Sequence, residues 1–284
     1  MIKDFFVLTK FVLSFAVSLS ALFAYIMAKG EIGTDMFIAT FAVLLVALGV
    51  SALNQVQEYK EDSQMDRTKH RPIASGRMSP QTGLIIASVL IIVSIGLIYD
   101  LLGWIGVSLF LFSFVWYNGF YTPLKKKNAF AVVPGALLGV VPPAIGWLTA
   151  GHSLMEIEFF ALGLFYFIWQ VPHFWLLVML FYSDYKTGGY PTTMKVFGQR
   201  GLRRLTFVWL IFTIQAGFFL VVTFAVSDQV ILILLALVGL LALASSFQLL
   251  GSKFELTSAR KVFMQINLLF LSTIILISVD AMIA

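Results

Sequence analysis

The sequence predicts an all-α integral membrane protein with nine transmembrane helices, and three observations support this prediction. The 284-residue chain is 60% hydrophobic with a mean hydropathy of +0.95, well above that of a soluble domain with a polar surface. Apolar runs of roughly 20 residues, long enough to cross a hydrocarbon core of about 30 Å, recur along its whole length. Lysines and arginines gather at one set of run ends, which indicates a single orientation.

The apolar runs follow one another without an intervening soluble domain, low-complexity tract or strong repeat, so we expect one domain over residues 1–284. The first run is interrupted by Lys10 and lacks a small-residue cleavage site, so it is expected to be a membrane span and not a cleaved signal peptide. The nine runs cover approximately residues 5–28, 35–56, 82–101, 103–121, 130–150, 157–182, 203–226, 229–250 and 262–283.

The positions of the basic residues indicate how these runs are oriented in the membrane. With a cytoplasmic N-terminus, 18 of the 19 lysines and arginines lie on the cytoplasmic side and only Lys29 lies on the other. We therefore expect a multi-pass membrane protein whose N-terminus and basic loops are cytoplasmic. The net charge of +5 belongs to one membrane face and does not argue for nucleic acid as a partner. The absence of cysteine excludes disulfides, thiolate metal sites and cysteine nucleophiles.

Three oxygen-bearing side chains form a column at the end of the second run. Asn54, Glu58 and Asp62 are spaced i, i+4, i+8, so a helix that continues past residue 56 carries them on one face. Two carboxylates and an amide suit Mg²⁺, which takes oxygen ligands and is usually completed by substrate phosphates and water. The spacing therefore predicts a metal site.

Basic residues follow this column directly. Arg67 and Arg71 are four residues apart, and arginine binds phosphate oxygens through paired hydrogen bonds. Carboxylates for a cation beside guanidinium groups for an anion are what a Mg²⁺–diphosphate requires. The competing interpretation is an ordinary cytoplasmic loop, but such a loop does not need aligned carboxylates that run into a span. Glu61, Asp66 and Lys69 fall off the column and are expected to be solvated.

Two further polar segments are expected at the same membrane face. After the sixth run, FYSDYKTGGYP places Asp184 and Lys186 before two glycines that break the helix. Asp184 offers a third carboxylate to the same ion or to a second one, although a helix cap and turn explain the segment equally well. After the fourth run, YTPLKKKN contains Lys125 in a triplet whose ordinary role is to set topology. Lys125 and Lys186 are candidates to bind a diphosphate.

The sixth run also carries polar groups at membrane depth. His173 follows Gln170 and Pro172, and ionisable groups at this depth tend to face a cavity or a partner. A buried histidine is ordinarily structural, and Pro172 frees a carbonyl that it can bond. On a continuous helix His173 and Asp184 project from nearly the same face, about 16 Å apart. An apolar stripe between them suits a lipid-like substrate whose charged head stays at the surface.

These motifs resemble those of the membrane prenyltransferases of the UbiA superfamily. The pattern N-x3-E-x3-D-x2-M-x-R-T-x2-R-P at residues 54–72 is similar to their first aspartate-rich motif. Five segments, in chain order, are similar to those of the protohaem IX farnesyltransferase (haem O synthase) branch: LTK at 8–10, MDRTKHRP at 65–72 within that motif, YTPLKKKN at 121–128, PGALLGVVPPAIGW at 134–147 and WQVPHF at 169–174.

The resemblance implies nine helices around a central cavity whose active site faces the cytoplasm. It implies transfer of a farnesyl group from farnesyl diphosphate to a vinyl group of haem B, with water adding to give haem O. Haem B is then a substrate, Mg²⁺ is the cofactor, and the lipid bilayer is the surrounding partner. The resemblance also leaves open a homo-oligomer or an association with haem A synthase.

Residue roles follow from the same resemblance. Asn54, Glu58 and Asp62 are expected to hold Mg²⁺ and the diphosphate. Arg67 and Arg71 are expected to stabilise the leaving diphosphate. The resemblance also assigns Asp184 to a second metal site and His173 to contact with the porphyrin.

The chain departs from the superfamily's pattern at two positions. Glu58 stands where many members have aspartate, so its carboxylate reaches one methylene further. Asp184 is a single acid where quinone-type enzymes have two, which disfavours a quinone precursor as the acceptor but leaves it, or a chlorin, as an alternative. A transporter is a different alternative, but the charges gather at one face and do not form a path across the bilayer.

Overall fold

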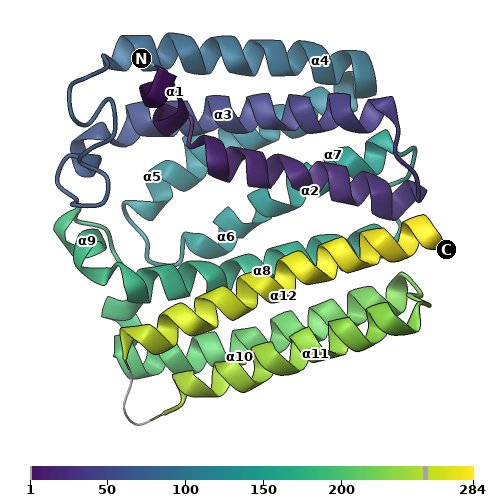
Figure 1. Ribbon diagram of the computed structural model, residues 1–284. Coiled ribbons are helices and arrows are strands. Elements are labelled where there is room, and N and C mark those ends of the chain that lie inside the picture. Colours follow the sequence, from purple (N-terminus) through teal and green to yellow (C-terminus); the bar gives the residue numbers. More distant parts are fainter. Residues whose placement is uncertain (1, 252–254) are drawn as a thin grey trace.

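The computed structural model describes residues 2–251 and 255–284, and within these ranges the chain contains helices and no strands. Figure 1 shows the helices as one bundle. In chain order the elements are α1 (Ile2–Leu8), α2 (Phe11–Lys29), α3 (Thr34–Asp62), α4 (Pro80–Phe114), the π-helix η1 (Val115–Tyr121), α5 (Thr122–Lys125), α6 (Val132–Ala136), the 3₁₀ turn η2 (Leu137–Val140), α7 (Val141–Thr149), α8 (Ile157–Leu180), α9 (Tyr182–Thr187), α10 (Thr193–Thr223), α11 (Gln229–Ser246), the 3₁₀ turn η3 (Phe247–Leu249) and α12 (Leu256–Ile283).

The nine predicted runs correspond to eight helical stretches in the described part of the chain that are long and apolar enough to span a membrane. The difference lies in one stretch, Pro80–Lys125, which contains 46 residues. At 1.5 Å per residue it is about 69 Å long, more than twice a hydrocarbon core of about 30 Å. Gly103 breaks it with φ 58° and ψ −146°, between the runs predicted at 82–101 and 103–121. This stretch therefore contains two spans joined at a glycine.

Two of the predicted spans are not regular helices. The first is divided at Lys10, which adopts the left-handed conformation (φ 48°, ψ 47°) between α1 and α2. The fifth is assembled from α6, η2 and α7, with 3₁₀ geometry at residues 137–140. Such departures from helix at membrane depth are tolerated where the backbone is covered by protein or lines a cavity.

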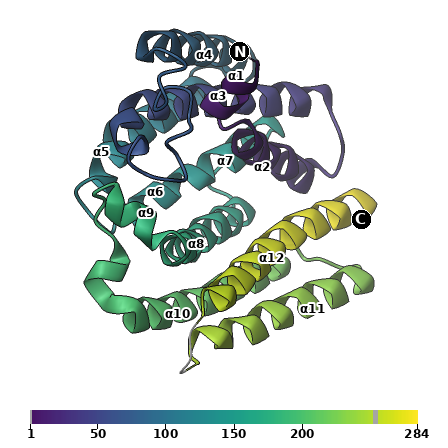
Figure 2. The same ribbon diagram turned by 60° about the vertical axis from the view of Figure 1, so that its left-hand side comes forward.

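One end of the bundle collects the charged segments. There α3 ends at Asp62, α4 begins at Pro80, α5 ends at Lys125, and α9 follows α8. This charged end lies on the left of Figure 1. At the other end α2 and α12 meet, where the Ser278 hydroxyl donates to the Phe23 carbonyl oxygen at 3.4 Å. Figures 1 and 2 both show these two helices separating toward the charged end.

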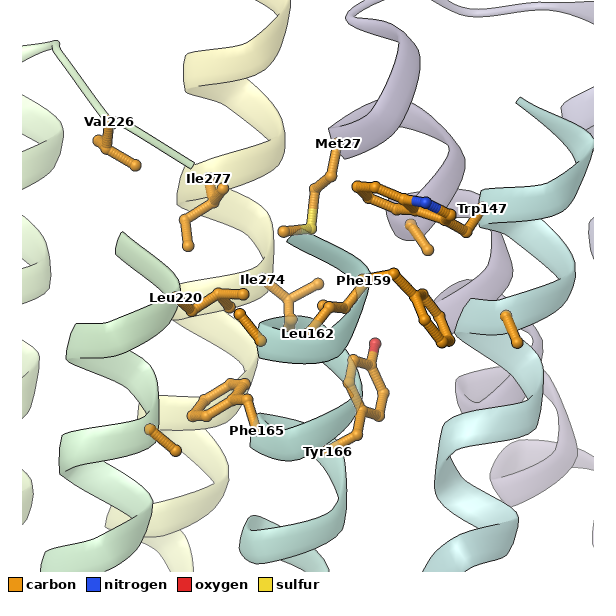
Figure 3. Close-up of a cluster of buried hydrophobic side chains, with 14 of the residues drawn as sticks. Met27, Trp147, Phe159, Leu162, Phe165, Tyr166, Leu220, Val226, Ile274 and Ile277 are labelled. Carbon is orange, nitrogen blue, oxygen red and sulfur yellow. The ribbon is translucent and has the colours of Figure 1, made fainter. Parts of the chain in front are cut away.

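The largest apolar core lies toward the end opposite the charges. Figure 3 shows side chains from several helices converging there, among them Met27 of α2, Trp147 of α7, Phe165 of α8, Leu220 of α10 and Ile277 of α12. Lipid tails are as apolar as these side chains, so close packing holds the helices together more than exclusion from water does. Because the helices are tightly packed at this end, the charged end is where the bundle has room for a cavity.

Gly146 tests how closely α7 packs on α2. A Cβ atom at this position would collide with the backbone carbonyl of Ala21. Gly146→Ala is expected to lower the free energy of unfolding by about 1–3 kcal/mol, because backbone atoms cannot yield as a flexible side chain does. Thermal unfolding of the purified protein in detergent measures this change. Gly96→Ala is the matched control, since nothing lies within 4 Å of its added Cβ; equal shifts in both variants would contradict the close approach.

Candidate active site

A cavity of about 770 Å³ lies at the charged end, between α1, α2, α3, α5 and α8. This volume is typical of a small-molecule site. Its apolar wall comes from the start of α2 and the second half of α8, and includes Phe11, Phe174 and Leu177. Its polar wall carries six acidic or basic side chains: Lys10, Glu58, Asp62, Arg67, Arg71 and Lys125. The cavity therefore has a charged side and an apolar side, as an amphiphilic ligand requires.

The predicted column is present. Helix α3 continues to Asp62, and Asn54, Glu58 and Asp62 all line the cavity with 0%, 3% and 2% of their surfaces exposed. The Asn54 side-chain nitrogen donates to Glu58 Oε2 at 3.0 Å and to the Thr122 hydroxyl at 3.1 Å. Carboxylates this deeply buried are stable only when they are paired and hydrogen-bonded.

Asp62 is paired with Arg71. Arg71 Nη1 donates to both carboxylate oxygens, at 2.8 and 2.7 Å. The turns between α3 and α4 bring the arginine back over the helix end, and the Thr68 hydroxyl fixes that return by donating to the Asp62 carbonyl at 3.0 Å. Arg71, which was predicted to bind phosphate, therefore pairs with Asp62, which was predicted to bind the metal.

Glu58 is held by two groups from distant segments. Lys125 Nζ donates to its Oε2 at 2.8 Å, and the Tyr190 hydroxyl donates to its Oε1 at 3.2 Å. Burial, with the Glu58 charge beside it, raises the pKa of Tyr190, so the phenol stays protonated and acts as a donor. Tyr190 is a site residue that the sequence did not reveal. It lies 132 residues along the chain from Glu58, and only the fold brings the two side chains together.

Lys10 is a second residue that was missed as a site candidate. Its Nζ donates to Asn54 Oδ1 at 2.8 Å from the left-handed break between α1 and α2. A left-handed lysine costs backbone strain that usually marks a functional position. Its signal in the sequence was a lysine that interrupts an otherwise apolar run.

The charges of the cavity do not balance. Four basic side chains, Lys10, Arg67, Arg71 and Lys125, face two carboxylates, Glu58 and Asp62, which leaves an excess of two basic groups over acidic ones. In a partly buried site this excess favours an anion. The surplus, and not the carboxylates alone, makes the cavity a candidate diphosphate site.

The donor set also fits Mg²⁺ when a substrate supplies further oxygens. Magnesium is usually bound by one or two carboxylates plus phosphates and water, which matches Glu58 and Asp62 with an incoming diphosphate. A protein cage of three or more is not present, because no group of three His, Cys, Asp or Glu side chains within residues 2–251 and 255–284 is placed to hold a metal. The sequence allowed Asp184 to join Glu58 and Asp62 around one ion. The structure does not bring the three carboxylates together in that way.

Asp184 instead lies beside Arg67. Its Oδ2 is 4.0 Å from Arg67 Nε, and Arg67 also lies over the Phe181 ring at 5.2 Å. Arg67 lines the cavity, whereas Asp184 and Lys186 do not; Lys186 is exposed near the end of α9. The structure therefore places Asp184 to orient an arginine of the site, and it does not bring Lys186 to the cavity.

The predicted stripe from His173 to Asp184 does not form on one helix. Helix α8 ends at Leu180, Phe181 leaves helical geometry (φ −120°, ψ 29°), and α9 begins at Tyr182. His173 does not line the cavity either, although the adjacent Phe174 does. The histidine belongs to the interface between α8 and α12, where its Nδ1 bonds to Asn267. The expectation of a single continuous face was wrong because it required the helix to pass unbroken through residue 181.

The three groups predicted to be solvated each have a partner of opposite charge. Lys69 pairs with Asp66 at 2.6 Å on the exposed surface, and Lys126 pairs with Glu61 at 2.6 Å. None of these residues lines the cavity. They provide charge-matched controls for the residues that do.

Lys10 provides a test of the anion surplus. Lys10→Met is expected to weaken binding of Mg²⁺–diphosphate about 10- to 100-fold, the loss of one hydrogen bond from a charged donor. Titration calorimetry of the purified protein with inorganic diphosphate and Mg²⁺ measures this change. Lys127→Met removes an exposed charge from the same end and should bind normally. Equal binding by Lys10→Met and the parent chain would remove Lys10 from the site.

Known proteins match both the sequence and the fold. The model of the UbiA prenyltransferase family matches residues 15–271. A protoheme IX farnesyltransferase of Oleidesulfovibrio alaskensis is 32% identical over 94% of this chain and 92% of its own length. One from Flavobacterium johnsoniae is 38% identical over 66% of this chain and 63% of its own length.

Solved structures share the arrangement of helices. A structure described for digeranylgeranylglyceryl phosphate synthase has a TM-score of 0.77 at 16% identity, covering 100% of this chain and 99% of its own. A UbiA homolog from Archaeoglobus fulgidus bound to GPP and Mg²⁺ has a TM-score of 0.68 at 12% identity, covering 97% of this chain and 99% of its own. These likenesses establish the fold, and the family match over most of the chain establishes its membership: the chain belongs to the UbiA prenyltransferase family.

Proposed function

We propose that this protein transfers the farnesyl group of farnesyl diphosphate to a vinyl group of haem B, forming haem O with Mg²⁺ as cofactor. The observation that carries the proposal is the cavity in which four basic side chains surround two buried carboxylates next to an apolar wall. Relatives named protoheme IX farnesyltransferase, at 32–38% identity, support haem as the acceptor.

The site chemistry suits ionisation of an allylic diphosphate. The C–O bond to the farnesyl group breaks and its electron pair leaves with the diphosphate, so negative charge grows on the leaving group. Arg67, Arg71, Lys10 and Lys125 lie where that charge develops and stabilise the transition state more than the ground state. Glu58 and Asp62 would hold Mg²⁺, which supplies further charge stabilisation for the leaving diphosphate.

The apolar wall protects the allylic cation. Phe11, Phe174 and Leu177 offer no nucleophile and exclude water from the farnesyl chain. The vinyl double bond of the acceptor then forms the new C–C bond. Water adds to the resulting cation beside the porphyrin and a proton is released, giving the hydroxyethylfarnesyl side chain. His173 of α8 is proposed to contact the haem, on the side of α8 that faces α12.

The charged end is proposed to face the cytoplasm of a bacterial-type inner membrane. The distribution of lysine and arginine along the sequence supports this orientation, since 18 of 19 are expected on the cytoplasmic side. The haem and farnesyl groups of the product are both largely apolar, so haem O remains in the bilayer. An enzyme that modifies haem O next, such as haem A synthase, would then receive it by lateral association.

The direct test incubates the purified protein with haem B, farnesyl diphosphate and Mg²⁺ and determines the mass of the extracted haem. Haem O is the expected product. A parallel reaction offers a quinone precursor as the acceptor. Unmodified haem together with an alkylated quinone precursor would overturn the haem assignment and leave the prenyltransferase assignment standing.

Pairs of variants test whether the charged residues of the cavity bind the diphosphate. Asp62→Asn and Arg67→Gln are expected to lower turnover at least 100-fold, because each removes charge from the diphosphate site. Asp66→Asn and Lys69→Gln remove an exposed ion pair a few residues away and should retain activity. Farnesyl transfer is measured by the same mass assay. Activity near that of the parent chain in Asp62→Asn or Arg67→Gln would refute the diphosphate assignment.

The variant His173→Ala distinguishes binding of haem from binding of the diphosphate. His173→Ala is expected to lose haem binding while its affinity for Mg²⁺–diphosphate stays within about twofold of the parent chain's, since His173 lies outside the charged cavity. Absorbance titration with haem and calorimetry with diphosphate measure the two affinities separately. Unchanged haem binding and turnover would return His173 to a structural role.

A further inference from the structure

A second, smaller cavity lies apart from the diphosphate site. Its volume is about 210 Å³, and it shares no lining residue with the larger cavity. Its walls are Arg200, Arg203 and Arg204 of α10 and residues 249–251, where η3 ends. Figure 1 shows the start of α10 and the end of α11 at the charged end of the bundle. Half of the six lining residues are arginines, and none is acidic.

These arginines belong to a stretch of sequence without acids. Residues 185–227 include five basic side chains and no aspartate or glutamate. Arg200, Arg203 and Arg204 are spaced i, i+3, i+4, so one face of α10 carries all three. Gly198 interrupts α10 with φ 67° and ψ 169°, so the arginines also lie near the positive end of the regular helix that follows. Like charges at this spacing and this position repel, and a bound anion would relieve that repulsion.

Arg203 closes the end of the helical stretch formed by α11 and η3. It is only 7% exposed, its Nε donates to the Leu249 carbonyl oxygen at 2.7 Å, and its Nη2 donates to the Gly251 carbonyl oxygen. The last carbonyls of a helix have no partner within it, and a basic side chain can satisfy them. Arg203 therefore fixes the distance between the two walls of the cavity.

Arg200 and Arg204 have no such structural role. Both are exposed, and within residues 2–251 and 255–284 no ion pair joins either of them to an acid. Membrane topology explains why basic residues gather at one membrane face. It does not require two of them to converge on a cavity that a third, buried arginine holds open. Their convergence indicates an anionic ligand.

The cavity lies at the expected depth of lipid headgroups. Residues 205–223 of α10 carry no charge and rise about 28 Å, close to a hydrocarbon core of about 30 Å. The arginines directly precede this segment and so lie at its boundary. One turn further along α10, the ring of Phe207 lies 5.4 Å from that of Phe247, and both Phe247 and Leu250 are exposed. The basic cavity therefore adjoins an apolar surface that faces lipid.

We propose that this second cavity binds the phosphate of an anionic phospholipid. Arg200 and Arg204 donate to the phosphate oxygens, and Arg203 adds positive charge beneath them. The acyl chains lie along Phe207 and Phe247. Basic pockets between transmembrane helices at a membrane face are suited to anionic lipid headgroups. A soluble phosphate compound offers the same charged group but leaves the apolar surface uncovered. The bound lipid joins α10 to the end of α11, away from the catalytic cavity.

The test titrates the full-length protein, stripped of lipid in a non-ionic detergent, and counts bound molecules by native mass spectrometry. Phosphatidylglycerol is the anionic probe, phosphatidylcholine has no net charge, and glycerol 1-phosphate has no acyl chains. The variant Arg200→Gln/Arg204→Gln removes two charges and keeps the buried Arg203. Lys127→Gln/Lys195→Gln is the matched control, because it removes two exposed charges from outside both cavities. Circular dichroism reports the folding of each variant.

The parent chain is expected to bind one phosphatidylglycerol about 10- to 30-fold more tightly than Arg200→Gln/Arg204→Gln does, the effect of two basic groups at a membrane surface. The lysine control should bind it as the parent chain does. Phosphatidylcholine and glycerol 1-phosphate should each bind the parent chain more weakly than phosphatidylglycerol.

Two results would overturn the inference. Equal affinity of both double variants for phosphatidylglycerol would leave the arginines as determinants of topology alone. Binding of glycerol 1-phosphate as tight as that of phosphatidylglycerol would assign the cavity to a soluble phosphate compound. None of the substituted residues lines the larger cavity, so the test is independent of the proposed function.

Discussion

Two buried ion pairs at the edge of the membrane hold the charged end of this bundle together. Asp62 is paired with Arg71, and Glu58 with Lys125, while both carboxylates are less than 5% exposed. Removing one partner from a buried pair leaves an uncompensated charge that is costly in a region of low dielectric. Each pair joins α3 to a different segment, the turns before α4 in one case and α5 in the other. The cavity keeps its shape because these segments cannot move without exposing or stranding a charge.

On the proposed function, the same two ion pairs would respond to the bound substrate. In the protein without substrate, the basic groups neutralise the acids; a Mg²⁺–diphosphate brings a cation for the acids and an anion for the bases. Arg71 and Lys125 would then turn to phosphate oxygens while Asp62 and Glu58 turn to the metal. Both carboxylates would then have a partner of opposite charge before and after binding, so neither would be left unpaired. The surplus of basic groups then remains to stabilise a leaving diphosphate.

Much of this arrangement follows from local sequence pattern, and some of it does not. The spans and the column from Asn54 to Asp62 were predictable because both depend on helical periodicity and apolar length. The partners of that column were not, since Lys125 and Tyr190 reach Glu58 from 67 and 132 residues away and no local rule specifies such pairs. The break at Phe181 also escaped prediction, because neither glycine nor proline marks it and the turn depends on tertiary packing.

A structure with bound Mg²⁺ and an unreactive analogue of farnesyl diphosphate tests most directly whether Glu58 and Asp62 exchange partners when the substrate binds. Arg71 Nη1 and Lys125 Nζ now lie 2.7 and 2.8 Å from the carboxylates. If the partners exchange, both nitrogens move to phosphate oxygens, and Glu58 and Asp62 coordinate the metal. A bound analogue that leaves both ion pairs intact, with its diphosphate outside this cavity, would contradict this exchange.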